Sequence, residues 1–210
     1  MLYDKDIREP LFDFLEEAYG KLRIIEEKQV GKSRADIVMV LPGLLTGIEI
    51  KSDADSYVRL SRQVKDYDRF FDRNMVVAGS SHAAHVREHV PGWWGIITVE
   101  QNDREVDFYV LRQPQENPMM NWKRKLSLLW RPELAHIQEL TAMPRYKEKS
   151  KAFVIEKILA KVPGEQLSVL VSEELFERDY TRIEEVIRAY KIQNRPELKG
   201  RTGKRKRRRP

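Results

Sequence analysis

Asp36, Glu49 and Lys51 are the residues whose types and spacing could do chemistry. Asp36 lies near the start of one β-branched, aliphatic segment, and Glu49 and Lys51 lie in the next, beyond the turn at Pro42-Gly43. Alternate residues of a strand project to one face, so Glu49 and Lys51 point together, and a hairpin can bring Asp36 beside them. Two carboxylates and an amine are costly to bury on an apolar sheet unless something pairs them, and a divalent cation would do so. Such an ion polarises a phosphoryl oxygen and lowers the pKa of bound water, while an amine stabilises developing negative charge.

A simpler explanation suits these three residues taken alone, namely an exposed strand face with a Glu49–Lys51 salt bridge. The next helix changes the balance, because Gln63 and Tyr67 are four residues apart and share one helical face. A Gln amide can bond a DNA phosphate or a catalytic water, and a Tyr hydroxyl can orient the amide. A surface Gln beside a half-buried Tyr is common. The occurrence of this pair together with Asp36, Glu49 and Lys51 is much less common and favours a catalytic site.

The elements that must position these residues follow from hydrophobic periodicity. Helical spacing predicts helices over 4–19, 57–71, 81–90, 122–140, 151–161 and 165–177. Short apolar, β-rich runs predict strands over 22–25, 35–40, 46–51, 75–78, 93–99 and 106–111. This order predicts an α/β fold in which helices flank a mixed β-sheet. We expect a core over 1–113, a helical C-terminal region over 114–190 and a basic, disordered tail over 191–210.

The tail dominates the net charge of +6. Residues 191–210 contain ten basic residues and one acid, a net +9, which leaves −3 for the first 190 residues. The densest run is Lys204-Arg205-Lys206-Arg207-Arg208-Arg209. Like charges keep such a run disordered until it meets a polyanion, and the run predicts a non-specific, salt-sensitive contact with DNA phosphates. A solubilising tail or a nuclear-localisation signal would have the same composition.

Composition excludes several other classes of protein. The chain has no cysteine, so disulfides, iron–sulfur clusters and cysteine zinc sites are ruled out. No apolar run reaches membrane-spanning length and the N-terminus has no apolar signal core, so we expect a cytoplasmic protein without a membrane partner.

Several motifs together resemble a known superfamily. The chain resembles the PD-(D/E)XK nucleases in four motifs: Arg34-Ala35-Asp36, the run from Gly47 to Asp53, Gln63-x-x-x-Tyr67 and Phe71-Asp72. More narrowly, the chain is similar to a family of small bacterial and phage proteins, on the evidence of Ile7-Arg8, Trp93-Trp94-Gly95 and the segment 128–134. This resemblance covers roughly residues 4–180. It implies a restriction-endonuclease-like core and a metal site at Asp36, Glu49 and Lys51, with Gln63 assisting. Ala35 stands where the motif has proline. The resemblance leaves open which further acid joins the site, with Glu9, Asp13, Glu16, Glu17 and Glu27 as candidates.

The function predicted is therefore a metal-dependent nuclease that hydrolyses DNA phosphodiester bonds in repair, processing or phage-related defence. Asp36, Glu49 and the Ile50 carbonyl would hold Mg²⁺ or Mn²⁺, Lys51 would stabilise charge, and Gln63 and Tyr67 would support them. The expected partner is DNA, and a homodimer or a larger repair or defence assembly is the expected oligomer. The alternative is an inactive nucleic-acid-binding or assembly protein with the same fold.

Other signals carry less weight. His82, His85 and His89 share one face of a short helix and could hold zinc, but a solvated face explains them better because no fourth ligand accompanies them. Strand alternation places one residue of Trp93-Trp94 in the core. Residues 151–177 could form a helix-turn-helix, but acids on the second helix favour a packing role. Better DNA-binding candidates precede it, namely Arg124, Lys125 and Arg131.

Overall fold

A six-stranded mixed sheet forms the centre of the fold in the computed structural model, which describes residues 2–102, 105–179 and 183–193. The strands lie side by side in sequence order: β1 (Arg23–Val30), β2 (Ser33–Leu41), β3 (Leu44–Lys51), β4 (Arg73–Gly79), β5 (Gly95–Asn102) and β6 (Glu105–Arg112). The β1–β2, β2–β3 and β5–β6 pairs are antiparallel, whereas β3–β4 and β4–β5 are parallel. The parallel crossovers require connecting segments on the faces of the sheet.

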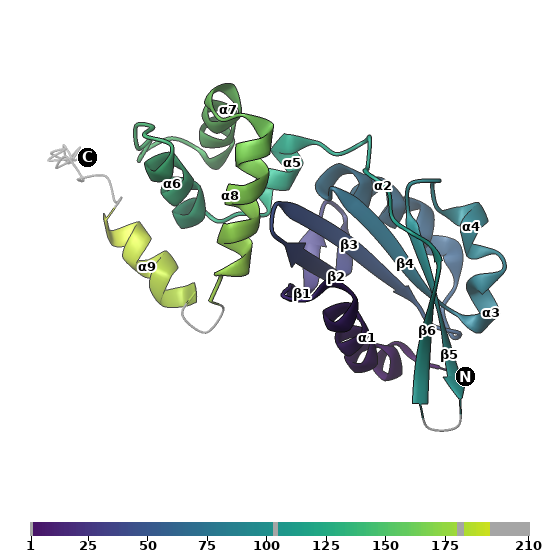
Figure 1. Ribbon diagram of the computed structural model, residues 1–210. Coiled ribbons are helices and arrows are strands. Elements are labelled where there is room, and N and C mark those ends of the chain that lie inside the picture. Colours follow the sequence, from purple (N-terminus) through teal and green to yellow (C-terminus); the bar gives the residue numbers. More distant parts are fainter. Residues whose placement is uncertain (1, 103–104, 180–182, 194–210) are drawn as a thin grey trace, which may run out of the picture.

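Helices cover both faces of this sheet (Figure 1). On one face, α1 (Asp4–Tyr19) buries Ile7, Leu11 and Leu15 against the strands. The 3₁₀ turn η1 (Tyr57–Arg59) leads into α2 (Leu60–Phe70), which packs on the other face. The remaining helices are α3 (Ser80–Ala83), α4 (Val86–His89), α5 (Trp122–Ser127), α6 (Arg131–Leu140), α7 (Lys151–Lys161), α8 (Gly164–Phe176) and α9 (Ile183–Gln193). The predicted α/β class, a mixed sheet flanked by helices, is confirmed.

The C-terminal helices share a core with the sheet. Val154 of α7 and Val171 of α8 belong to the same buried cluster as Val38 and Val40 of β2. The Ser172 hydroxyl also accepts a hydrogen bond of 2.8 Å from the backbone N–H of Gly43, in the β2–β3 turn. Of the two helices predicted over 151–177, α8 therefore packs against the sheet and α7 packs on α5 and α6, which agrees with the packing role that the acids on the second helix favoured. The basic run 204–209 lies outside the described residues.

Some predicted elements have different boundaries in the structure. The helix predicted over 122–140 is two helices, because the Glu133 carboxylate accepts a hydrogen bond of 2.6 Å from the Trp130 N–H and caps a new helix, with proline in its first turn. The helix predicted over 81–90 is likewise two short helices, α3 and α4. Helix α9 has no counterpart among the predicted elements. No helix in the described part of the chain has the length and apolarity needed to cross a membrane.

The β1–β2 ladder is interrupted at the position that matters most for the site. Pairing runs from Arg23↔Val40 to Val30↔Ser33, but Glu27 and Asp36, which would face each other in this register, do not pair. Glu27 has a φ of 54°, in the left-handed region that non-glycine residues rarely adopt. The side-chain alternation changes phase here, because Ala35 belongs to the core under α2 and Ile37 to the core under α1. Asp36 therefore occupies an opening in the sheet.

Candidate active site

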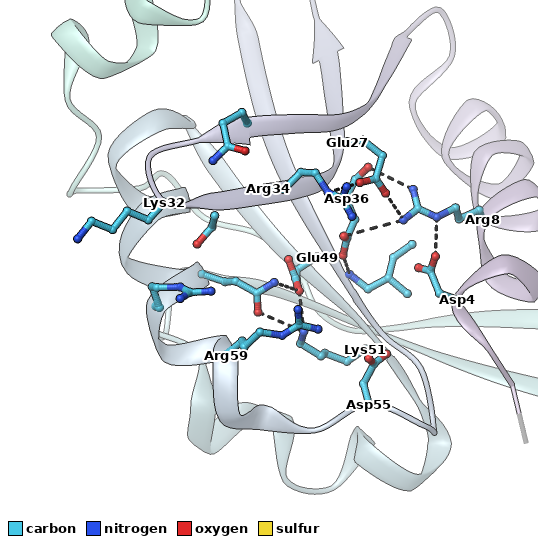
Figure 2. A pocket seen from close by; sticks show the side chains of 15 residues that line it. Asp4, Arg8, Glu27, Lys32, Arg34, Asp36, Glu49, Lys51, Asp55 and Arg59 are labelled. Atoms are coloured by element: carbon cyan, nitrogen blue, oxygen red, sulfur yellow. Dashed lines mark hydrogen bonds and ion pairs between the residues drawn. The ribbon is translucent and has the colours of Figure 1, made fainter.

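One hollow of about 390 Å³ at this opening is lined by Asp36, Glu49, Ile50, Lys51 and Gln63 (Figure 2), whereas the fully buried Tyr67 does not line it. Its walls come from α1, the β1–β2 hairpin, the end of β3, and the segment from η1 into α2. The charged side chains that line it are Asp4, Arg8, Glu27, Lys32, Arg34, Asp36, Glu49, Lys51, Asp55, Arg59 and Arg62. The hollow is thus strongly polar although it opens beside an apolar core.

Glu49 and Lys51 form a buried ion pair at the end of β3. The Lys51 Nζ lies 2.6 Å from Glu49 Oε1, and the two side chains are only 4% and 1% exposed. Gln63, on α2, donates to the same Oε1 and accepts from Lys51 Nζ at 3.2 Å. The predicted shared face of Glu49 and Lys51 is confirmed. The exposed strand face offered as the simpler explanation is wrong, because α2 covers this salt bridge.

Tyr67 joins the two carboxylate-bearing strands. Its hydroxyl donates to Glu49 Oε2 at 2.6 Å and accepts from the backbone N–H of Asp36 at 3.1 Å. Burial, followed by the charges of Glu49 and Asp36, raises the pKa of Tyr67 well above 10, so the hydroxyl keeps its proton and remains a donor. Gln63 and Tyr67 therefore hold Glu49 from one helical face, and the alternative of a surface Gln with a half-buried Tyr is wrong.

Asp36 lies across the sheet opening from Glu49. Its Oδ2 accepts a 2.8 Å hydrogen bond from the backbone N–H of Ile50, just beyond the last β2–β3 ladder pair, Ile37↔Ile48. Burial, and next the charge of Glu49, raise the pKa of Asp36 from 3.8 to about 7, although the Ile50 N–H, Lys51 and Arg8 act to lower it. Near neutral pH this acid is therefore poised between its two protonation states.

Ile50 contributes its backbone to the same opening. In an antiparallel pair, the N–H and the C=O of one residue point toward the same neighbouring strand. Because the Ile50 N–H points toward Asp36 on β2, the Ile50 carbonyl points to that side as well. The Ile50 side chain belongs to the core under α1. This geometry suits the predicted ligand role of the carbonyl.

Arg8 closes the α1 side of the hollow. Its guanidinium bonds Asp4 at 2.7 Å and Glu27 at 2.8 Å and lies 3.9 Å from Asp36 Oδ1. Glu27 also pairs with Arg34, so its carboxylate joins two cations at the interrupted ladder position. Of the five further acids considered from the sequence, Glu27 alone lines the hollow, whereas the α1 acids Glu9, Asp13, Glu16 and Glu17 are exposed outside it.

Sequence reasoning missed two carboxylates that support the site. Asp53 accepts hydrogen bonds from the backbone N–H of Leu2 and from the N–H and hydroxyl of Ser81, which fixes the chain after β3. Asp68, next to Tyr67, accepts from the indole N–H of Trp94 at 2.8 Å and of Trp93 at 3.2 Å. Neither role is visible in the sequence, because each depends on donors that lie more than twenty residues away.

The remaining candidates lie elsewhere. Trp94 is fully buried and Trp93 partly buried, so the prediction that one of them enters the core is confirmed. His85 and His89 are exposed, as the solvated histidine face predicts, whereas His82 is partly buried and its ring packs on Tyr57. Lys125 is a wrong choice for DNA binding, since it is fully buried and bonds both Asp72 oxygens at 2.7 Å.

Comparisons with known proteins assign the chain to a family. The sequence profile described as Bacteriophage P4 protein cII matches residues 1–195. The chain belongs to the P4 cII family. Protein cII of Enterobacteria phage P4 is 29% identical over 101 residues, which cover 48% of this chain and 38% of the phage protein. Among solved structures, Pyrococcus furiosus SfsA in complex with Ca²⁺ is similar over 50% of this chain and 59% of that chain, with 17% identity and a TM-score of 0.31. A phage protein family is thus confirmed, whereas the nuclease superfamily stays a prediction.

The donor set of this cII-family chain suits a hard divalent cation in part. Asp36 and Glu49 provide two carboxylates beside the Ile50 carbonyl, and magnesium sites typically use one or two carboxylates and keep several waters. Within residues 2–102, 105–179 and 183–193, no group of three acidic, histidine or cysteine side chains is arranged as a metal site. A cation here would therefore need water or substrate oxygens to complete its coordination.

Proposed function

We propose that this protein is a metal-dependent nuclease that hydrolyses DNA phosphodiester bonds with Mg²⁺ or Mn²⁺. The observation that carries the proposal is the convergence in one polar hollow of two carboxylates, the buried Glu49 and the partly buried Asp36, beside a single amine, Lys51. Desolvation and the charge of Glu49 make a charged Asp36 unfavourable even with Arg8 3.9 Å away, as the raised pKa of Asp36 expresses, and a bound cation would relieve this cost. The resemblance of the motifs to PD-(D/E)XK nucleases, and the restriction-endonuclease-like fold it implies, supports the same assignment.

Each residue has a role that its position allows. Asp36, Glu49 and the Ile50 carbonyl would hold the cation, which when bound supplies Lewis-acid polarisation of the phosphate and a more acidic water. Lys51 offers a fixed positive charge at the end of the same strand, where it can stabilise negative charge that develops on the phosphate. Gln63 and Tyr67 keep the Glu49 carboxylate oriented, which lowers the reorganisation needed during reaction.

One observation favours the second candidate, a nucleic-acid-binding or assembly protein of the same fold without cleavage. Both oxygens of Glu49 already accept hydrogen bonds from the protein, one from Lys51 and Gln63 and the other from Tyr67. A carboxylate whose two oxygens are satisfied in this way can serve a purely structural role. Mn²⁺ binding separates the candidates, because the nuclease must bind the ion through Asp36 and Glu49 and the second candidate has no need to.

A cleavage panel tests the proposal directly. Single-stranded, duplex, nicked and branched DNA, and RNA, are incubated with the full chain in Mg²⁺ or Mn²⁺. We expect Asp36→Asn and Glu49→Gln to abolish cleavage, because each removes a charge that holds the cation. Lys51→Ala should lower the rate on the order of a hundredfold to a thousandfold, the usual effect of losing one preorganised stabiliser of developing charge.

A matched control excludes a contaminating nuclease. Asp13→Asn removes one exposed carboxylate of α1 outside the hollow, so it should cleave as the wild type does. Circular dichroism and thermal melting establish that each variant is folded. Wild-type cleavage by folded Asp36→Asn or Glu49→Gln, or no cleavage by the wild type on any substrate in either metal, would refute the proposal.

A further inference from the structure

Three basic residues on the rim of the hollow have no acidic partner in the described part of the chain. Arg8 bonds Asp4 and Glu27, Arg34 bonds Glu27, and Lys51 bonds Glu49. The remaining cations of the lining are Lys32, Arg59 and Arg62, and no carboxylate of the described residues lies within ion-pair distance of them. All three are exposed. The uncompensated positive charge of the hollow is therefore confined to these side chains.

These cations gather on one side of the carboxylates. Figure 2 shows Lys32 on the β1–β2 hairpin and Arg59 below Glu49, while Arg8, Asp4 and Glu27 lie on the opposite side, toward α1. Arg59 and Arg62 are three residues apart at the start of α2 and so lie close together on the helix. Apart from Asp55, which bonds Ser52, the hollow consequently has a side of exposed cations and a side whose charges are mutually neutralised.

Asp66 fixes the hairpin cation relative to the helix cations. This α2 residue accepts hydrogen bonds from the Lys32 N–H at 3.1 Å and from the Ser33 hydroxyl at 2.7 Å. Gly31, with a φ of 60°, permits the approach, because a Cβ there would lie 2.5 Å from Asp66 Oδ1. The backbone of Lys32 is therefore tied to α2, the helix that carries Arg62 and begins after Arg59, although Lys32 lies at a hairpin turn.

We infer that Lys32, Arg59 and Arg62 form a phosphate-binding rim that holds a polynucleotide backbone on one side of the bond to be cleaved. Exposed Lys and Arg side chains without acidic partners neutralise backbone phosphates without reading sequence. Asp36 and Glu49 lie between this rim and the neutralised side, so the strand would cross from the rim toward the two carboxylates. The inference rests on the proposed function, because it places the rim beside that reaction centre.

Binding in the presence of EDTA tests the rim separately from catalysis. The affinity of the full chain for a labelled single strand and for the matching duplex is measured between about 50 and 200 mM salt. Arg59→Gln/Arg62→Gln should make the slope of log K against log salt shallower by about 1.8 on duplex and about 1.4 on single strands, as two lost phosphate contacts predict. Over this salt range, wild-type duplex affinity should accordingly fall about tenfold more than that of the variant. Lys32→Gln should change the slope by about half as much.

The control is Lys65→Gln/Arg69→Gln, which removes two exposed positive charges from the same helix outside the hollow. The basic tail is present in every variant, so it cancels from the comparison. Slopes that fall for Arg59→Gln/Arg62→Gln but not for the control, on either nucleic acid, support the rim. Equal slopes in both double variants, or no change in either, overturn it. If the rim variant loses binding while wild type never cleaves, the rim stands and the nuclease proposal fails.

Discussion

Replacing Tyr67 with Phe removes one buried hydroxyl that connects two strands of the site. Glu49 Oε2 would lose its 2.6 Å donor and the Asp36 N–H its 3.1 Å acceptor, in a position with no solvent exposure to replace them. A lost hydrogen bond to a charged group costs about 2 kcal/mol and a buried, unsatisfied N–H about 1 kcal/mol, so we expect a loss of about 3 kcal/mol. For a domain of this size that loss corresponds to a melting temperature roughly 6–12 °C lower.

Thermal and urea unfolding of Tyr67→Phe measures this loss, with Tyr57→Phe as the matched control. The Tyr57 hydroxyl donates one hydrogen bond of 3.1 Å to the His82 carbonyl, a neutral acceptor, outside the site. Its removal should cost about 1 kcal/mol. If the two variants lose the same stability, the Tyr67 hydroxyl does not sustain the charged carboxylate of Glu49, and the account of how α2 supports the site is wrong.

Three further substitutions test the packing around the site, each followed by unfolding measurements. Gly47→Ala would place a Cβ 2.3 Å from a ring carbon of Phe71, so we expect a loss of about 2 kcal/mol, and wild-type stability would contradict this close approach. Lys125→Met leaves the Asp72 carboxylate without its cation and should lower the free energy of unfolding by about 3 kcal/mol. Adding Asp72→Asn should restore part of this stability, and no restoration would show that the unpaired charge is not the cause. Burial raises the pKa of Asp68 despite its indole and amide donors, so the folded state binds this proton more tightly than the unfolded state, and the stability it confers is lost as pH rises through the folded pKa. The stability of Asp68→Asn relative to wild type should therefore improve from about pH 4 toward neutrality, whereas a constant difference would refute the shift.

The parts of the site that lie on single elements could be predicted from the sequence. Glu49 and Lys51 share a face because strands alternate, and Gln63 and Tyr67 share one because helices repeat every 3.6 residues; both rules are local. The interruption opposite Asp36 could not be predicted, because Glu27 adopts a positive φ without being a glycine or an asparagine.

Long-range burial was equally hidden from the sequence. Lys125 lies in a basic stretch that suggests a surface helix, yet its amine is buried because Asp72 lies within bonding distance. Whether a lysine meets such a partner depends on the packing of segments more than fifty residues apart. The same holds for Asp68, whose indole donors follow on a later part of the chain.

The arrangement of the sheet also sets an order for folding. Asp36, Glu49, Lys51, Gln63 and Tyr67 all come from the β1–β2–β3 meander and the helix that follows it, so short loop closures suffice to bring them together. The residues that enclose α2 come later in the chain, since Trp94, which packs against Tyr67, and α5, which contacts α2, both follow it. We therefore expect the carboxylates of Asp36 and Glu49 to come together while water still surrounds them. The electrostatic cost of their proximity would then arise in the late folding steps that enclose α2 and remove this water.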